Sequence, residues 1–149
     1  MVRYFSRLKE NEDGQSLVEF ALVFVFVLIP VLFGIIQFGF IFGGQIVMTG
    51  AAREGARMAI VGEDNGLVLE RMENYIKAAG FITYEKDSAV ITPENRENTD
   101  IGDELSIDLF GSVPIIVPFI DFLTDEEGNY PISSSAIMRI EQQGGVASP

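Results

Sequence analysis

The sequence of 149 residues contains no cysteine, no histidine and no tryptophan. Without cysteine the chain forms no disulfide, and its redox compartment cannot be inferred. Without histidine it lacks the commonest general base and the commonest metal ligand. It also lacks the glycine-rich loop that cradles phosphates. We therefore expect no enzymatic activity and no cofactor.

Positive charge is also scarce. Ten lysines and arginines stand against 22 aspartates and glutamates, which gives a net charge of −12. A nucleic-acid surface needs clustered Lys and Arg to neutralise phosphates, so no nucleic-acid partner is expected. After Gly43, seven basic residues oppose eighteen acidic ones. The C-terminal part of the chain is therefore predicted to be an acidic domain.

The sequence is rich in apolar residues at one place. Between residues 20 and 36 the only interruptions are Pro30 and Gly34, and the run stays mostly apolar as far as Phe42. About 20 residues at ~1.5 Å each are enough for a helix to cross the ~30 Å hydrocarbon core of a bilayer. We predict a long N-terminal helix over residues 15–62, with a transmembrane part at about 17–42. Residues 63–149 are then one small extracytoplasmic domain.

Basic residues near the span favour a cytoplasmic N-terminus. Arg3, Arg7 and Lys9 precede the span closely, whereas Arg53 and Arg57 come well after it. The positive-inside rule therefore gives a modest signal for a single-pass protein with its N-terminus in the cytoplasm. A removable secretory signal peptide is the alternative, but its apolar region normally runs only ~7–15 residues.

Glu19 lies at the N-terminal edge of this apolar run. A carboxylate at mid-span costs about 2.5–3.5 kcal/mol on insertion scales and less near the interface. Two interpretations are open. The side chain can lie in the headgroup layer and interact with the helix dipole, or it can have a function within the membrane.

Three segments resemble one protein family. Residues 14–20, GQSLVEF, resemble the processing site of type IV prepilins of the Tad branch. Residues 51–59, AAREGARMA, are similar to a second signature, that of the TadE-like minor pilins or pseudopilins, and residues 136–141, AIMRIE, resemble the closing strand of that family. The charged residues of these two motifs are Arg53, Glu54, Arg57, Arg139 and Glu141.

The resemblance implies a place in the cytoplasmic (inner) membrane with the N-terminus inside, a processing pathway and a set of partners. A prepilin peptidase would cut after Gly14, remove residues 1–14 as a leader, and make Gln15 the new N-terminus. Glu19 would then neutralise the amine of Gln15 in an adjacent subunit during assembly of a Tad-type adhesive pilus, which serves cell adhesion. A buried amine and a buried carboxylate are each costly alone and tolerable as a pair. The implied partners are the peptidase, the major pilin, other minor pilins and the inner-membrane assembly platform.

The predicted stem helix carries three packing features. Pro30 removes a backbone donor and leaves the Phe26 carbonyl without its usual partner, which predicts a kink or local loosening. Gly39 and Gly43 have the GxxxG spacing that lets a second helix approach closely. One arc of the helix holds only small residues: Ala51, Ala52, Gly55, Ala56 and Ala59. We expect this small face to pack on the chain's own domain, and a subunit contact is the alternative. Opposite this face, Glu54 and Arg57 form a possible i,i+3 ion pair.

The rest of the chain predicts an α+β domain. An amphipathic helix is expected over residues 67–79, and strands are expected over 88–92, 104–110 and 132–140. We predict a small antiparallel sheet laid on the small face of the stem. The apolar stretch 113–123, interrupted by prolines, can cover the core, lie against the membrane or contact a partner; we favour the first.

Two other functions remain open at this point. The chain can be a permanent single-pass anchor whose acidic domain binds an extracytoplasmic partner. An anchored hydrolase is a second alternative, but Ser133, Ser134 and Ser135 have no histidine to activate them. The acidic residues between 121 and 129 do not follow the spacing of a calcium loop, so no metal site is predicted. We interpret the chain as a TadE-like minor pilin or pseudopilin.

Overall fold

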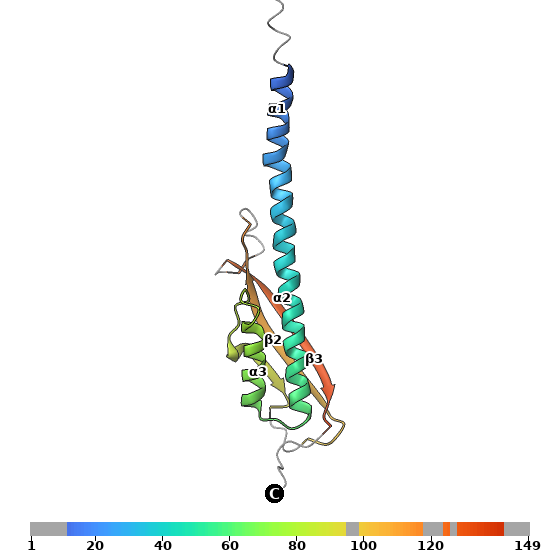
Figure 1. Ribbon diagram of the computed structural model, residues 1–149. Coiled ribbons are helices and arrows are strands. Elements are labelled where there is room, and N and C mark those ends of the chain that lie inside the picture. Colours follow the sequence, from blue (N-terminus) through green and yellow to red (C-terminus); the bar gives the residue numbers. More distant parts are fainter. Residues whose placement is uncertain (1–11, 95–98, 118–123, 126–127, 142–149) are drawn as a thin grey trace, which may run out of the picture. The chain divides into compact units, whose positions relative to one another are not determined.

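The computed structural model describes residues 12–94, 99–117, 124–125 and 128–141. The chain forms two compact units, residues 1–38 and 39–149. One helical segment begins in the first unit and ends in the second, and a second helix and a three-stranded sheet belong to the second unit (Figure 1).

The helical segment consists of three consecutive elements. Helix α1 spans Glu12–Val23, a single π-helical turn η3 spans Phe24–Leu28, and helix α2 spans Ile29–Ile60. In the π turn, the N–H of Ile29 donates to the carbonyl of Phe24, five residues back. Pro30 follows directly. Its ring would collide with the carbonyl four residues back in a regular α-helix, and the wider π turn relieves that collision. The local loosening expected from Pro30 is therefore present as the π turn η3.

The first unit exposes apolar side chains along its described length. All residues from Gly14 to Leu28 are exposed. Ten of them, which is more than half of this stretch, have large hydrophobic side chains. The stretch from Gly14 to Ile60 is the one helical segment in the described residues that is long and apolar enough to cross a membrane. A signal sequence can have the same length and composition. Exposure of so much apolar surface is costly in water and favourable in lipid.

Helix α2 ends in a Schellman motif. Gly62 has a φ of 90°, which is readily adopted by glycine because it has no Cβ. The N–H of Gly62 donates to the carbonyl of Ala59 at 3.2 Å, and the N–H of Glu63 donates to that of Met58 at 3.3 Å. These two bonds satisfy carbonyls at the end of the helix.

Helix α3, Asn65–Lys77, starts two residues earlier than the sequence predicts. Its N-cap is Asp64, whose carboxylate accepts a hydrogen bond of 2.7 Å from the N–H of Gly66. The chain leaves the helix through Gly80, which has a φ of 75°. As expected, the helix is amphipathic, and its buried residues are Val68, Met72 and Ile76.

The sheet contains β1 (Ala89–Thr92), β2 (Glu104–Pro114) and β3 (Asn129–Arg139), after the short 3₁₀ turn η4 (Lys86–Ser88). The strands are antiparallel in the order β1-β2-β3. The central residue Ile107 lies opposite Ile91 on one side and Ala136 on the other. Alternate residues of β2 point into the core, as the alternation in the sequence predicts: Leu105, Ile107, Leu109 and Val113 are fully buried.

The ends of β2 and β3 extend farther than expected. Val113 pairs with Tyr130 and Pro114 with Asn129, so the apolar stretch 113–123 begins inside the sheet. Pro131 hides this extension in the sequence, since proline removes a backbone donor and usually marks an edge or a turn. In β3 it lies on a strand that forms an edge of the sheet, where it is tolerated. Residues 118–123 lie outside the described ranges, and so does most of the expected loop.

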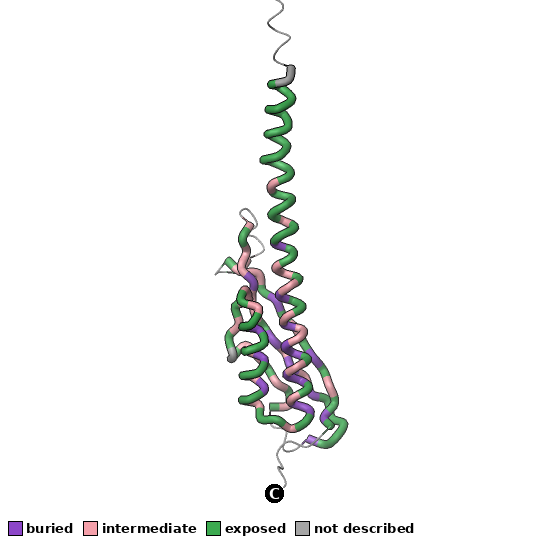
Figure 2. Tube along the Cα trace, in the orientation of Figure 1, coloured by how far each residue is buried: buried purple, intermediate pink, exposed green. Residues whose placement is uncertain are grey.

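The core of the second unit lies between the sheet and the two helices. Buried residues gather on the facing sides of these elements (Figure 2). Met48 from α2, Met72 from α3 and Ile107 from β2 are all fully buried in one cluster. The fold class is therefore α+β, with the antiparallel sheet packed on the long helix, as predicted.

Candidate functional site

The predicted processing site lies in the first turns of α1. The helix begins at Glu12, so the bond between Gly14 and Gln15 is already within it. The side-chain amide of Gln15 donates a hydrogen bond of 3.1 Å to a carboxylate oxygen of Glu19. Both residues are exposed and lie one helical turn apart on the same face. The carboxylate predicted to meet an amine is thus held on the face that carries Gln15.

Gly14 makes this turn of the helix easy to open. Glycine costs about 1 kcal/mol relative to alanine in a helix interior, and the first turn lacks part of its hydrogen bonding in any helix. A Cβ built on Gly14 would meet no atom within 4 Å. The glycine is therefore not required for packing inside the described chain. Without a side chain, Gly14 leaves the peptide bond to Gln15 flexible and free of steric hindrance.

The small face of α2 packs inside its own domain. Ala51, Ala52 and Ala56 are fully buried and Ala59 is nearly so. At Gly55, an added Cβ would overlap the sulfur of Met72 and lie 2.7 Å from its Cγ. The absence of side-chain bulk here lets α3 and the sheet approach the helix backbone.

Gly44 belongs to the same packing surface, although sequence reasoning missed it. An added Cβ there would lie 2.6 Å from Cγ2 of Val113 and 3.1 Å from Cδ1 of Ile132. Gly44 is seven residues before Ala51, which places it on the same side of the helix. Extending the small face backwards by two turns would have identified it.

The GxxxG pair meets no second helix within the described chain. A Cβ on Gly39 would have no atom within 4 Å. A Cβ on Gly43 would touch the ring of Phe81 at 3.4 Å, and that ring packs edge-on against Phe40 with centroids 5.6 Å apart. Inside the domain, Gly43 therefore accommodates an aromatic ring, and Gly39 is left open.

The charged residues of the central motif, residues 51–59, do not belong to the buried core. Arg53 and Arg57 are exposed, and Glu54 forms a salt bridge of 3.5 Å with Arg71 of α3. The ion pair of Glu54 is thus between helices and replaces the expected pair with Arg57. A pair exposed to this degree contributes little to stability, about 0–1 kcal/mol.

The C-terminal motif, residues 136–141, contacts the end of helix α2, just after the central motif. Arg139 is the last residue of β3 and lies opposite Glu104, with its side chain exposed. The backbone N–H of Glu141 donates a hydrogen bond of 3.2 Å to the carbonyl of Ile60, the last residue of α2. The two segments that the resemblance singled out are therefore adjacent in space.

A shallow hollow of about 380 Å³ lies beside Arg53 of the central motif. Tyr75 forms one wall of this hollow, and its hydroxyl would lie 2.7 Å from a Cβ added to Gly50. Arg53 and the exposed Ile46 also line the hollow. Among the described residues, no group of three or more acidic side chains is placed to hold a metal ion.

Tyr84 is half-buried, and its hydroxyl points into the protein. Its hydroxyl is enclosed and has no hydrogen-bond partner in the described part of the chain. Burial, and secondarily the negative charge of Glu73, raises the pKa of Tyr84 from 10.0 to about 12. Burial disfavours the charged phenolate, so the folded state holds the proton more tightly than the unfolded state does.

Replacing Tyr84 by phenylalanine should change the alkaline stability of the domain. In the native protein the stabilising effect of the raised pKa is complete below pH 10 and is lost as the pH rises from 10 to about 12. Because the tyrosine is partly exposed, we discount the effect to about 1 kcal/mol. Denaturant unfolding of the full chain in detergent micelles at pH 9 and pH 11.5 measures it. Tyr84→Phe should lose less stability than the native chain over this interval, whereas Tyr75→Phe should lose as much; equal losses in all three proteins would contradict the assignment.

The chain thus carries a small α+β domain after an exposed apolar helix, and a Gly-Gln bond and a glutamate lie at the start of that helix. A family model described as TadE-like protein matches residues 14–57. Over this segment the chain is similar to the TadE-like family, a pilin-like group not known to be enzymatic. Comparison with curated proteins and with solved structures finds no match.

Proposed function

We propose that the chain is a minor pilin or pseudopilin of a Tad-type pilus, inserted in the inner membrane and processed after Gly14. The observation that carries the proposal is the coincidence of two features. The matched segment 14–57 covers the exposed apolar helix, and its first turns hold both the Gly14–Gln15 bond and Glu19. The apolar helix would span the membrane with its N-terminus in the cytoplasm, where a prepilin peptidase would act.

Cleavage changes the chemistry at Gln15. It releases an amine at the helix N-terminus, one turn from the carboxylate of Glu19. Inside the bilayer an unpaired carboxylate is costly, and so is an unpaired amine. Two subunits that pair the amine of one with the Glu19 of the other remove both costs. The pairing favours lateral association of processed chains with the major pilin, with other minor pilins and with the assembly platform.

The charge of Glu19 is the feature to test. Glu19→Ala should still insert in the membrane, because it removes a charge from an apolar helix, but it should reduce pilus assembly about tenfold or more. Loss of one partner from a buried ion pair costs about 3–5 kcal/mol. Glu19→Gln is the matched variant, since its amide oxygen can still accept the bond from Gln15 while the charge is gone.

Assembly is measured as surface pili per cell and as the amount of this chain in sheared pilus fractions. Both variants should insert normally and assemble poorly. Normal piliation with Glu19→Gln and poor piliation with Glu19→Ala would assign the role to the hydrogen bond instead of the charge. Normal piliation with both would exclude the pair and favour a permanent membrane anchor whose domain binds an extracytoplasmic partner.

A further inference from the structure

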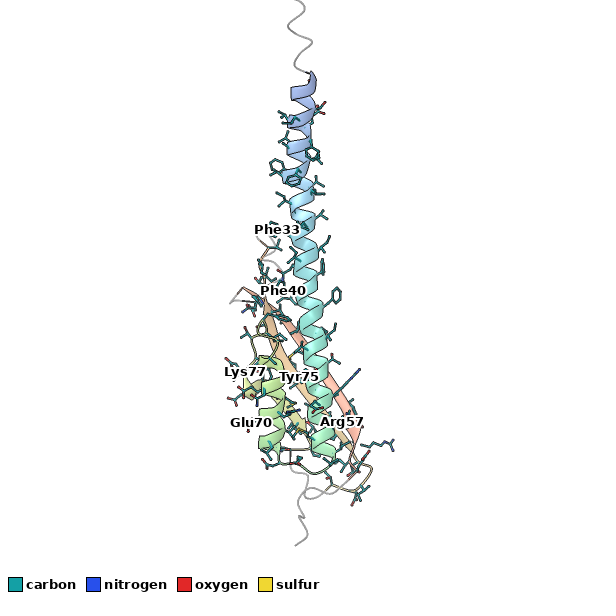
Figure 3. All side chains as sticks on the ribbon, viewed as in Figure 1. Phe33, Phe40, Arg57, Glu70, Tyr75 and Lys77 are labelled. Atoms are coloured by element: carbon teal, nitrogen blue, oxygen red, sulfur yellow. The ribbon has the colours of Figure 1, made fainter. Side chains whose placement is uncertain are left out.

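Helices α2 and α3 run side by side in opposite directions, which brings particular residues to the same level. Gly55 of α2 faces Met72 of α3, and Glu54 is paired with Arg71. We count from the contact between Gly55 and Met72. Two residues forward in α2 is Arg57, and two residues backward in α3 is Glu70, so these two residues lie at about the same level along the helices. Figure 3 shows Arg57 on α2 and Glu70 on α3 at matching heights.

Arg57 and Glu70 are both exposed and form no ion pair within the described chain. The same construction places Arg53 level with Asn74, which is also exposed. It places Val61, just after α2, near the level of Leu67; these two side chains are 47% and 51% exposed. The outer surface of the two helices therefore carries Val61, Arg57 and Arg53 along α2 and Leu67, Glu70 and Asn74 along α3.

This surface is complementary to itself. A two-fold axis parallel to the helices preserves height and sets α2 of one copy opposite α3 of the other. It would place Arg57 of one copy against Glu70 of the other, and the reverse pair would form as well. The same operation brings each Arg53 to an Asn74 and each Val61 to a Leu67. An apolar contact would thus flank two ion pairs, in a chain whose net charge of −12 otherwise makes copies repel.

We propose that two copies of this chain associate through the outer surface of α2 and α3, with Arg57 and Glu70 forming reciprocal ion pairs. The proposal rests on the membrane insertion given above, because copies inserted in one bilayer in the same direction have their domains on the same side and at equal height. A membrane thereby restricts the copies to symmetry axes along its normal.

Charge exchange tests the proposal on the full chain in liposomes. Arg57→Glu and Glu70→Arg should each weaken association about tenfold or more, because each substitution disrupts both symmetric pairs. The double variant R57E/E70R should recover most of it, since the pairs are restored with reversed sign. Association is measured by fluorescence energy transfer between labelled copies at varied protein-to-lipid ratios. The control R139E changes a charge on β3 and should leave association as it was.

The absence of cysteine allows a second measurement. Copies carrying Arg57→Cys, mixed with copies carrying Glu70→Cys, should be joined efficiently by a short thiol cross-linker in the liposomes. Ile137→Cys, on the outer face of β3, should cross-link poorly with Glu70→Cys. A monomeric native chain would overturn the proposal. So would unchanged association in the single charge variants, no recovery in the double variant, or equal cross-linking through Ile137.

Cleavage after Gly14 is measured separately, in membranes that contain the cognate prepilin peptidase, so the two proposals can fail separately. Cleavage without self-association would contradict the proposed dimer and leave the proposed pilin function unaffected. Self-association without cleavage would contradict the pilin function and support a dimeric membrane anchor.

Discussion

Replacing Gly14 by alanine is expected to slow removal of residues 1–14 about tenfold or more. A Cβ on Gly14 meets no atom within 4 Å, so the substitution disturbs no contact in the described chain. Alanine strengthens the helix by about 1 kcal/mol just where a peptidase must open it. It also adds a methyl group at the scissile bond, and one carbon in a fitted pocket changes rates by about 10–200-fold. The loss should therefore be kinetic and confined to processing.

The rate is measured from the intact mass of the chain over time in membranes that contain the cognate prepilin peptidase. Gly34→Ala is the matched control, because it makes the same change in the apolar helix at a position that is also open. Its processing should equal that of the native chain. Equal rates for Gly14→Ala and the native chain would show that the glycine is not part of a cleavage site.

Replacing Gly55 by valine is expected to destabilise the domain by about 2–3 kcal/mol. An added Cβ overlaps the sulfur of Met72, which is fully buried and therefore has little space to move. On the other side it meets Cδ1 of Ile107 at 3.4 Å. Overpacking of this kind typically costs about 1–3 kcal/mol, and the branched side chain adds strain. The strain should separate α3 from α2 and expose the core.

The free energy of unfolding is obtained from guanidinium titration of the full chain in detergent micelles. Gly39→Val is the matched control, because a Cβ added there meets no atom within 4 Å. Its stability should stay within about 0.5 kcal/mol of the native value. If Gly55→Val is no less stable than Gly39→Val, close approach at Gly55 is not what holds the domain together.

The features that the sequence predicts well are those that depend on local spacing. The apolar run, the small face from Ala51 to Ala59 and the amphipathic pattern of α3 each follow from 3.6 residues per turn. In each case the residues that interact or share a face are near one another in the sequence.

The features that escape prediction depend on distant residues. Helix spacing places Gly44 on the small face, but the residues that pack against it, Val113 and Ile132, come from another part of the chain. Glu54 has Arg57 within reach along its own helix, yet it pairs with Arg71, because α3 lies against that side of α2. Helix spacing predicts the neighbouring Arg57 as the partner of Glu54, whereas the packing of α3 on α2 makes Arg71 the partner in the folded chain.

Strand ends were missed for a different reason. Pro131 and the Gly111-Ser112 dipeptide have the composition of a turn, yet Gly111 pairs with Ile132 and Ser112 with Pro131 in the sheet. Ser112 also exchanges two backbone hydrogen bonds of 2.9 Å with Thr83 on its other side. Hydrogen bonding on both sides of β2 keeps these residues in the strand despite their composition.

The most direct test of the account is the N-terminal sequence of the chain purified from its native membrane, where the cognate peptidase is present. The account predicts that the mature chain starts at Gln15, as a free amine or as pyroglutamate, and that it lacks residues 1–14. A chain that keeps those residues in the same membrane would contradict the account and would favour a permanent anchor.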